Sequence, residues 1–277
     1  MNGFDLSTAQ DIRLGSTTVS AVYLGNTLVW PTGPHDYSQD YFTLEVIDNG
    51  TLQFYTHGRV NGSEDRITLQ YRVGNSNWTS VTETPYDQSD PYGDQYINFG
   101  NVSVGDKIEF KHTGTMRIGS GIAQYRTWQG SCRCRVYGNI MSLLYGDSFV
   151  NQNEIISWRE FYMFFYGSAV TRIGHLVLPA TVLKDYCYAY MFDNCYIETM
   201  PILPAPVLVE SCYQNMFYDC TSLNSITCYA TDISATNCLS NWLYNVAATG
   251  TFYKDSNTTY PSGTSGIPSG WTIENIQ

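Results

Sequence analysis

The sequence predicts a multidomain, β-rich protein that ends in a repeat solenoid. Residues 178–252 repeat one pattern every 25 residues, residues 41–138 hold short alternating segments without amphipathic helices, and residues 1–33 hold a smaller repeat of period ten. Fixed-period repetition is typical of solenoids, and closely spaced short strands are typical of a sandwich. We therefore predict an N-terminal β-hairpin segment (1–33), an all-β sandwich (36–138) and a C-terminal α/β solenoid with caps at both ends (139–277).

The N-terminal segment repeats a unit of ten residues. Leu14 to Val19 and Leu24 to Val29 each read as strand, tight turn and strand, with Gly and Asn supplying the positive φ of the turns. Two short hairpins are marginal alone in water. We expect them to dock on a partner, or else to be the first hairpin of the domain that follows. The residues expected to dock are Leu14, Val19, Leu24, Val29 and Trp30.

The sandwich is predicted after a break at residues 31–34, which read Pro-Thr-Gly-Pro. Residues 42–46 alternate apolar with polar, residues 48–50 are a hairpin turn signal, and residues 52–55 continue the strand pattern. Further candidate strands are 67–72, 96–99, 107–111 and 132–137. Strands at this spacing indicate a β-sandwich, in which we expect Trp78 and Trp128 to be core anchors rather than exposed platforms.

The solenoid is predicted from recurring residues at an offset of 25. Leu178-Pro179-Ala180 returns at residues 203–205, Cys187-Tyr188 at 212–213 and Met191-Phe192 at 216–217, while a third copy slips by one residue. Within a copy, apolar residues four and five positions apart share one stripe of a short helix. Residues 138–173, where Met163-Phe164 echoes the later Met-Phe pairs, are expected to cap the stack, and residues 255–273 the opposite end. The expected core residues are Cys187, Tyr188, Met191, Phe192, Cys195, Cys212, Tyr213, Met216, Phe217, Cys220, Cys238 and Trp242.

The recurring cysteines favour buried reduced thiols. Free cysteine packs as a small hydrophobe, and no C-x-x-C spacing points to a metal site. Disulfides and metal ligation are the alternatives. Cys132 and Cys134 lie two apart on a predicted strand, so both face the same side and do not easily bond each other.

The repeat text resembles the BspA-like leucine-rich-repeat family. The resemblance is carried by the leucine-proline-alanine, cysteine-tyrosine and methionine-phenylalanine steps, then by residues 220–223 (CTSL), 250–252 (GTF) and 266–273 (GIPSGWTI). It covers about half of the chain, from near Tyr137 to Ile273. It implies a leucine-rich-repeat solenoid that serves as a binding scaffold, on a bacterial surface or in a tailed bacteriophage. Residues 12–31 also resemble N-terminal pieces of phage appendage proteins, which implies docking to a particle.

The charge balance argues against nucleic acid or an anionic membrane as a partner. The formal net charge is −11 and no Lys/Arg cluster is present, whereas phosphate binding needs clustered cations. No secretory signal precedes Asp5, and no window is apolar enough to span a bilayer. We therefore expect a virion protein, assembled in the cytoplasm of a host bacterium, rather than an exported adhesin.

The inventory of catalytic residues predicts that the chain is not an enzyme and needs no cofactor. Its four histidines lie in no nucleophile motif, and G-x-S-x-G, P-loop and H-E-x-x-H sequences are absent. Glu154 with Glu160, or Asp87 with Asp94, are the carboxylate pairs that a glycosidase could use. The loop Asp87–Asp94 is rich in oxygen ligands but lacks the spacing of an EF-hand, so an acidic turn facing solvent is favoured over a calcium site.

Positions that differ between copies are the candidate binding residues. Tyr186, Tyr190, Tyr196 and Tyr218 correspond to Ser211, Asn215, Thr221 and Asp193 in the neighbouring copy. Tyrosine combines a flat ring with a hydroxyl, which suits saccharide or protein surfaces. The alternative is that these rings only shield neighbouring turns.

These observations predict a structural appendage of a tailed phage, such as a head fibre, a tail fibre or a decoration subunit. Its N-terminal segment would bind other virion proteins, its copies would form a homo-oligomer with a trimer favoured, and its solenoid would bind a host-surface glycan or protein. The alternatives are a bacterial cell-surface adhesin and a carbohydrate-active accessory module or enzyme. The sequence leaves open the position in the virion, the receptor and the oligomeric state.

Overall fold

The computed structural model describes residues 36–57, 66–85, 94–113, 125–198 and 202–276, together with four short strands before them. The chain separates into two units, Met1–Asp36 and Tyr37–Gln277. In the first unit, β1 (Arg13–Leu14) pairs antiparallel with β2 (Thr17–Thr18), and β3 (Val22–Leu24) with β4 (Thr27–Trp30). The side chains expected to dock, from Leu14 to Trp30, lie outside the described residues.

The second unit is built almost entirely of strands. Its described helical segments are η1 (Tyr37–Gln39), α1 (Ser142–Tyr145) and η2 (Gly146–Ser148). The strands of the first half are β5 (Phe42–Val46), β6 (Gly50–His57), β7 (Thr68–Val73), β8 (Thr79–Thr82), β9 (Gln95–Val102), β10 (Lys107–His112), β11 (Tyr125–Gln129) and β12 (Cys134–Asn139). Those of the second half are β13 (Val170–Val177), β14 (Tyr196–Ile197), β15 (Ile202–Leu203), β16 (Ser225–Cys228), β17 (Gly250–Asp255) and β18 (Trp271–Ile276).

Two sheets pack face to face in the first half. One is seven-stranded, in the order β14-β13-β12-β5-β10-β7-β8, and the other is β11-β6-β9. Between them, the fully buried ring of Trp128 on β11 lies 5.6 Å from Phe42 on β5 and 4.8 Å from Phe110 on β10, measured between ring centroids. The expected core position of Trp128 is confirmed. Trp78 is only half-buried, and the cations of Arg72 and Lys111 lie over its ring.

Strand β12 connects the sandwich to the coils that follow. It pairs antiparallel with β5 on one side and parallel with β13 on the other. Hydrogen bonding in the seven-stranded sheet therefore passes without a break from the first half of this unit into the second. The boundary predicted between residues 138 and 139 lies inside this shared strand.

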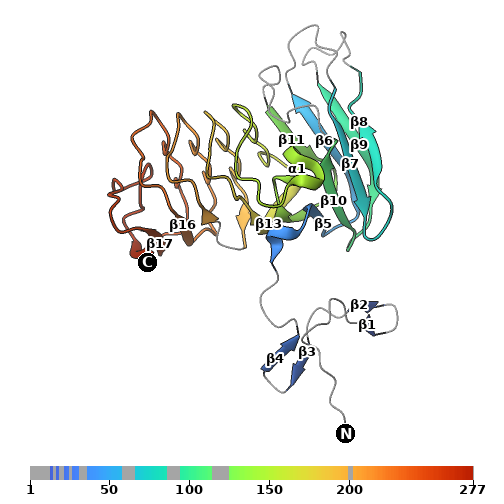
Figure 1. Cartoon of the computed structure of the whole chain (residues 1–277), viewed down its shortest axis with the longest axis horizontal. Helices are drawn as coiled ribbons and strands as arrows, with labels where there is room; N and C mark the ends of the chain where they lie inside the picture. The colour runs from blue at the N-terminus through green and yellow to red at the C-terminus, as the bar shows by residue number, and fades with distance from the viewer. Residues whose placement is uncertain are drawn as a thin grey trace. The chain divides into compact units, whose positions relative to one another are not determined.

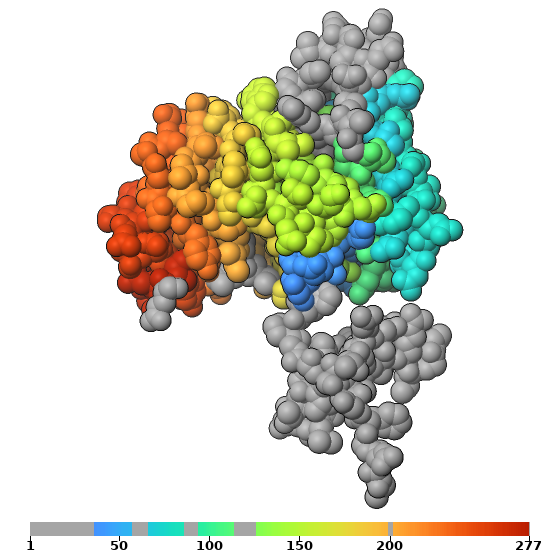
Figure 2. All heavy atoms as spheres, in the orientation of Figure 1, coloured from blue at the N-terminus to red at the C-terminus, as the bar shows by residue number. Residues whose placement is uncertain are grey.

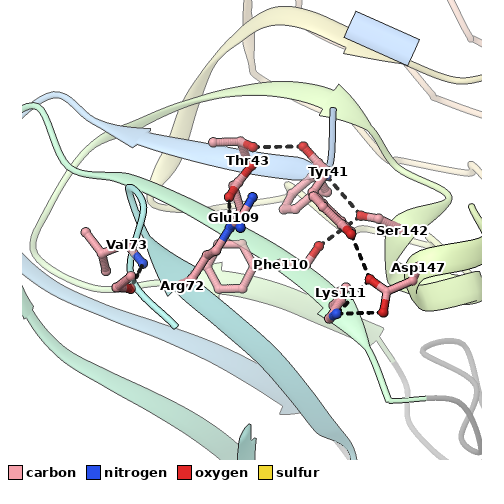
Figure 3. A network of polar contacts seen from close by, with 11 residues as sticks. Tyr41, Thr43, Arg72, Val73, Glu109, Phe110, Lys111, Ser142 and Asp147 are labelled. Atoms are coloured by element: carbon pink, nitrogen blue, oxygen red, sulfur yellow. Dashed lines mark hydrogen bonds and ion pairs between the residues drawn. The ribbon is translucent and has the colours of Figure 1, made fainter. Parts of the chain in front are cut away.

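A polar network fixes the start of the coils against the sandwich (Figure 3). The buried hydroxyl of Ser142 in α1 accepts a hydrogen bond from the Phe42 amide and donates one to the Phe110 carbonyl, both 2.9 Å long. Asp147 in η2 accepts from the Lys111 ammonium at 2.6 Å and from the Tyr41 hydroxyl at 2.7 Å. Burial and this bond to Asp147 raise the pKa of Tyr41 to about 12.

The C-terminal half is a solenoid of stacked coils. One side of the stack carries parallel strands, β13 with β14 and then β15, β16, β17 and β18 in order. The other side is formed by the turn segments 158–166, 185–194, 210–219 and 236–245, one in each coil. Figure 1 shows the strands along the lower edge of the stack, and in Figure 2 the coils lie against one another as adjacent bands from yellow-green to red.

The short helix expected around residues 209–217 is not formed. Ser211, Asn215 and Asp219 have φ of 51°, 51° and 56°, and a left-handed residue every four positions interrupts a right-handed helix. Alternate amides donate to the next coil instead, as from Tyr213 to the Cys238 carbonyl and from Phe217 to the Trp242 carbonyl, both at 3.0 Å. The α/β character expected for the repeats is therefore replaced, in the described coils, by strands and turns.

Like residues lie over like through the stack. Rings at one position form a ladder of Phe161, Tyr188, Tyr213 and Trp242, with centroid separations of 5.8, 6.1 and 6.2 Å. Phe165, Phe192 and Phe217 form a second ladder with separations of 5.5 and 5.3 Å. The expected core residues Cys187, Tyr188, Met191, Phe192, Cys195, Cys212, Tyr213, Met216, Phe217, Cys220, Cys238 and Trp242 are all buried.

The cysteines occupy equivalent positions in successive coils. The amides of Cys187, Cys212 and Cys238 each donate to the carbonyl three residues earlier, at 3.2, 3.3 and 3.3 Å. All eight cysteines are buried free thiols, and Cys132 and Cys134 approach to 3.7 Å between their sulfur atoms. Burial raises the pKa of Cys187 to about 12, so this thiol stays protonated at neutral pH.

The segment expected to be an N-terminal cap contains a full coil. The amides of Arg159, Phe161 and Phe165 donate to the carbonyls of Asp185, Cys187 and Met191 at 3.0, 2.8 and 3.0 Å, the same pattern that joins the later coils. At the other end, the Trp242 indole donates to the Gly266 carbonyl at 2.8 Å. The segment after β17 thus covers the last ring of the first ladder.

Candidate binding site

The residues with positive φ in the turn segments lie in columns that run from coil to coil. Positive φ recurs every four residues in each turn segment, and the inter-coil hydrogen bonds align these positions from coil to coil. One column contains Arg159, Tyr186, Ser211 and Asn237, and a second contains Met163, Tyr190, Asn215 and Asn241. The two residues that follow each Tyr186 or Tyr190 position point into the core.

The first two coils carry unusual residues in these columns. Asn and Asp tolerate the left-handed conformation because their short polar side chains bond locally, and the third and fourth coils use Ser and Asn in these two columns. The first and second coils place Arg159, Met163, Tyr186 and Tyr190 there, with φ between 56° and 58°. Each such residue costs about 1 kcal/mol of backbone strain. Strained residues held by a rigid framework are a reason to look for function at that place.

Four of the residues in this region form a compact cluster with Arg159. The guanidinium carbon lies 4.8 Å from the ring centroid of Trp158, 5.0 Å from that of Tyr162 and 5.3 Å from that of Tyr186. Tyr190 packs edge-to-face on Tyr162 with centroids 5.8 Å apart. We call Trp158, Arg159, Tyr162, Tyr186 and Tyr190 the Arg159 cluster.

The neighbours of the Arg159 cation are aromatic rings rather than a carboxylate. Among the described residues it makes no ion pair, and its Nε atom is closed to solvent and has no hydrogen-bond acceptor. Trp158 remains 44% exposed. At the edge of the cluster, the Tyr186 hydroxyl donates to the exposed carboxylate of Glu210 at 3.2 Å. The site therefore offers a cation, flat apolar rings and hydroxyl partners on one surface.

Comparison with known proteins assigns the chain to no family. No family model, curated protein or solved structure matches the chain. The resemblance to the BspA-like family stays a prediction from the residues that carry it.

The four tyrosines predicted to bind lie in three different settings. Tyr186 and Tyr190 both belong to the Arg159 cluster. Tyr218 stacks on Tyr244 of the fourth coil, with centroids 4.5 Å apart and planes 11° from parallel. Tyr196 lies on β14, 54% exposed, with the cation of Arg172 5.2 Å from its ring centroid. A binding role for each of them stays a prediction.

Comparing the repeat copies with one another does not find Trp158, Arg159 and Tyr162. The reason is that the Met163-Phe164 match places the first coil one residue out of register. Met163-Phe164 resembles the later Met-Phe pairs, yet the residue that stacks over Phe192 is Phe165. Aligning Phe165 with Phe192, and Phe161 with Tyr188, places Arg159 beside Tyr186. The aromatic spacing of four residues, which both coils share, is the signal that could have found it.

The carboxylates considered for glycosidase chemistry are engaged in other contacts. Glu160 is buried and accepts a hydrogen bond from Ser157, while Glu154 pairs with Lys184 at 3.3 Å. Residues 86–93, which hold most of the predicted acidic loop, lie outside the described residues. Within the described ranges, no group of three or more His, Cys, Asp or Glu side chains is arranged to hold a metal, and no helix has the length and apolar character of a membrane span.

Proposed function

We propose that this chain is a structural appendage of a bacteriophage virion, a head fibre, tail fibre or decoration subunit, whose solenoid of the BspA-like leucine-rich-repeat type binds a host-cell glycan or surface protein. The observation that supports binding is the Arg159 cluster, in which the exposed ring of Trp158 and three half-buried tyrosines surround a cation on a stack of coils. We propose no catalytic role.

The framework beneath the cluster supports a binding role because it is held in place before any ligand arrives. The turn segments of the first and second coils are joined by main-chain hydrogen bonds of 2.8 to 3.0 Å at alternate residues from Arg159 to Phe165. The ring ladders fill the space directly beneath them. A preorganised surface loses less conformational entropy on binding than a mobile one does.

The chemistry of the surface suits sugars and protein side chains. Trp and Tyr supply large flat contact areas with few rotatable bonds, and they are enriched at interfaces for that reason. The guanidinium of Arg159 in the cluster and the carboxylate of Glu210 beside Tyr186 fix the orientation of a polar ligand. A second stacked pair, Tyr218 with Tyr244, extends the aromatic character to the third and fourth coils.

Attachment is proposed for the N-terminal segment. Its short antiparallel pairs, β1 with β2 and β3 with β4, are of a size that gains stability by packing on another chain. In this proposal the segment binds other virion proteins and the copies associate, with a trimer as the expected symmetry. A bacterial cell-surface adhesin is the second candidate, supported by the same binding surface and the same repeat resemblance.

Two experiments separate these proposals. Mass spectrometry of purified virions detects the chain if it is a virion component, and its consistent absence there, together with its presence on bacterial envelopes, would favour the adhesin. Binding of the fluorescently labelled full chain to bacterial cells tests the display role. We expect cell binding that a Tyr186→Ala, Tyr190→Ala double variant loses, with Tyr229→Ala as the matched control, since Tyr229 is 43% exposed and lies outside the predicted binding residues. Equal binding by wild type and double variant would refute the assigned surface.

A further inference from the structure

We propose that the Arg159 cluster binds an acidic saccharide, with Arg159 holding the sugar carboxylate and the rings of Trp158 and Tyr162 packing on the apolar face of the sugar. This inference rests on the proposed binding function and names the class of its ligand.

The first step is that Arg159 lacks the partner that other arginines of the chain have. Arg72, Arg126, Arg133, Arg135 and Arg172 each lie within 4.0 Å of a carboxylate. The chain has 25 acidic and 14 basic residues, so a carboxylate for Arg159 would be easy to supply. The described part of the chain supplies rings instead.

The second step is that the rings leave the guanidinium a defined way to bind. Aromatic rings attract the cation through the negative charge of their own faces, so they take up none of the five hydrogen-bond donors of the guanidinium. The Nε atom is closed to solvent and has no acceptor among the described residues, so the terminal nitrogens are the donors available to a ligand. Two parallel N–H donors match the two oxygens of a carboxylate.

The third step is that the surroundings match the rest of a sugar. One face of a pyranose ring exposes C–H groups that pack on aromatic rings, as at other Tyr-rich and Trp-rich surfaces. The Glu210 carboxylate and the Tyr186 hydroxyl, 3.2 Å apart, can accept from and donate to sugar hydroxyls. Glu210 also repels an anion, so the ligand carboxylate is expected at Arg159 and the hydroxyls toward Glu210.

The fourth step is that a neutral ligand would bind this site more weakly than an acidic one. It would cover the guanidinium without providing an opposite charge, and burying a charged group without a partner is unfavourable. A uronic or sialic acid sugar provides the carboxylate, the apolar face and the hydroxyls in one residue.

The test is isothermal titration of the full chain with three acidic probes, each matched to a neutral form. The probes are oligogalacturonate against its methyl ester, oligoglucuronate against its methyl ester, and sialyllactose against lactose. We expect at least one acidic probe to bind about tenfold or more tightly than its neutral match, with affinity falling as salt rises. Equal affinity for both members of every pair, or no binding to any probe, would overturn the inference.

Variants assign the binding to the cluster. We expect Arg159→Gln to weaken binding of the acidic probe about tenfold to a hundredfold, and Arg159→Lys to lose less, because lysine keeps the charge but not the planar pair of donors. Arg172→Gln is the matched control, since Arg172 also lies over a tyrosine, Tyr196. Circular dichroism before and after heating verifies that each variant folds. Equal weakening by Arg172→Gln would overturn the assignment.

Failure of this inference can be told apart from failure of the proposed function. If the chain binds cells through Tyr186 and Tyr190 while no acidic probe binds, the ligand class is wrong and the binding role stands. If the chain binds neither cells nor any probe, both are wrong.

Discussion

Replacing Phe192 with alanine removes the middle ring of a ladder that runs through the stack of coils. The ring is 1% exposed, and it lies 5.5 Å from Phe165 and 5.3 Å from Phe217 with planes 15° and 10° from parallel. Its removal leaves a cavity in contact with three coils. If like residues stack on like as described, this position contributes to two interfaces between coils at once.

The expected loss follows from burial and stacking. Truncation of a buried phenylalanine to alanine lowers the free energy of unfolding by about 3 to 5 kcal/mol, which includes the cavity that remains. Each aromatic pair contributes about 0.5 to 1.5 kcal/mol beyond its buried area, and Phe192 loses two such pairs. We therefore expect a loss near the upper end, about 4 to 5 kcal/mol.

Urea unfolding followed by tryptophan fluorescence measures this loss, with Tyr196→Ala as the control. Tyr196 is 54% exposed, so its truncation should change the free energy of unfolding by no more than about 1 kcal/mol. The reasoning would be refuted if Phe192→Ala lost less than about 1.5 kcal/mol, or no more than the control.

Three further predictions test separate features of the coils. Asn241 has a φ of 50°, a conformation that glycine adopts without strain and alanine does not. Asn241→Ala should therefore lower the free energy of unfolding by about 1 kcal/mol, and Asn241→Gly should not. Equal losses in urea unfolding would contradict the assigned conformation. Burial and the neighbouring carboxylate of Asp219 raise the pKa of Asp193 to about 6, so the folded chain binds this proton more tightly than the unfolded chain does. The contribution of Asp193 to the free energy of unfolding therefore falls as pH rises from about 4 to above 6. Asp193→Asn should flatten that fall by on the order of 1 kcal/mol after allowance for solvent screening, and an unchanged pH profile of thermal unfolding would refute the shift. A Cβ on Gly250 would lie 2.4 Å from the Asn224 carbonyl oxygen and 2.7 Å from the Trp271 ring. Because both distances are shorter than van der Waals contact, Gly250→Ala should lower the melting temperature by several degrees. An unchanged melting temperature would contradict the close packing of β17 on its neighbours.

The core residues of the solenoid were predictable from the sequence because the same residue types recur at the same position of each copy. Cys187 and Cys212, or Met191 and Met216, recur at a fixed offset since each copy must fill the same space in the stack. The core position of Trp128 was also predictable, although no strand was predicted around it, because a large apolar ring is mostly buried in a folded domain.

The turn segment of each repeat was predicted wrongly as a short helix. Apolar residues four and five positions apart fit one stripe of a helix, and they fit equally a turn segment in which every fourth residue is left-handed. The distinguishing signal is the spacing of Asn237, Asn241 and Asn245, since asparagine is favoured in that conformation and disfavoured inside helices. Hydrogen bonding to a neighbouring coil is a tertiary feature, so one copy read alone could not reveal it.

Two of the five residues of the Arg159 cluster were predictable in the same way. Tyr186 and Tyr190 stood out because the next copy has other residues at those positions. Arg159 and its neighbours did not, because the first coil departs from the repeat text and no cysteine marks its register. The continuous sheet through β12 was not predictable either, because a strand's second partner depends on how distant segments pack.

The central claim is that alternate amides of each turn segment bind the next coil, which fixes the surface that carries the Arg159 cluster. Scalar coupling through hydrogen bonds, measured by NMR, tests it directly at Tyr213. We predict coupling between the Tyr213 amide nitrogen and the carbonyl carbon of Cys238, where the structure places a 3.0 Å hydrogen bond. Coupling to the carbonyl carbon of Val209 instead, as in an α-helix, would contradict the account.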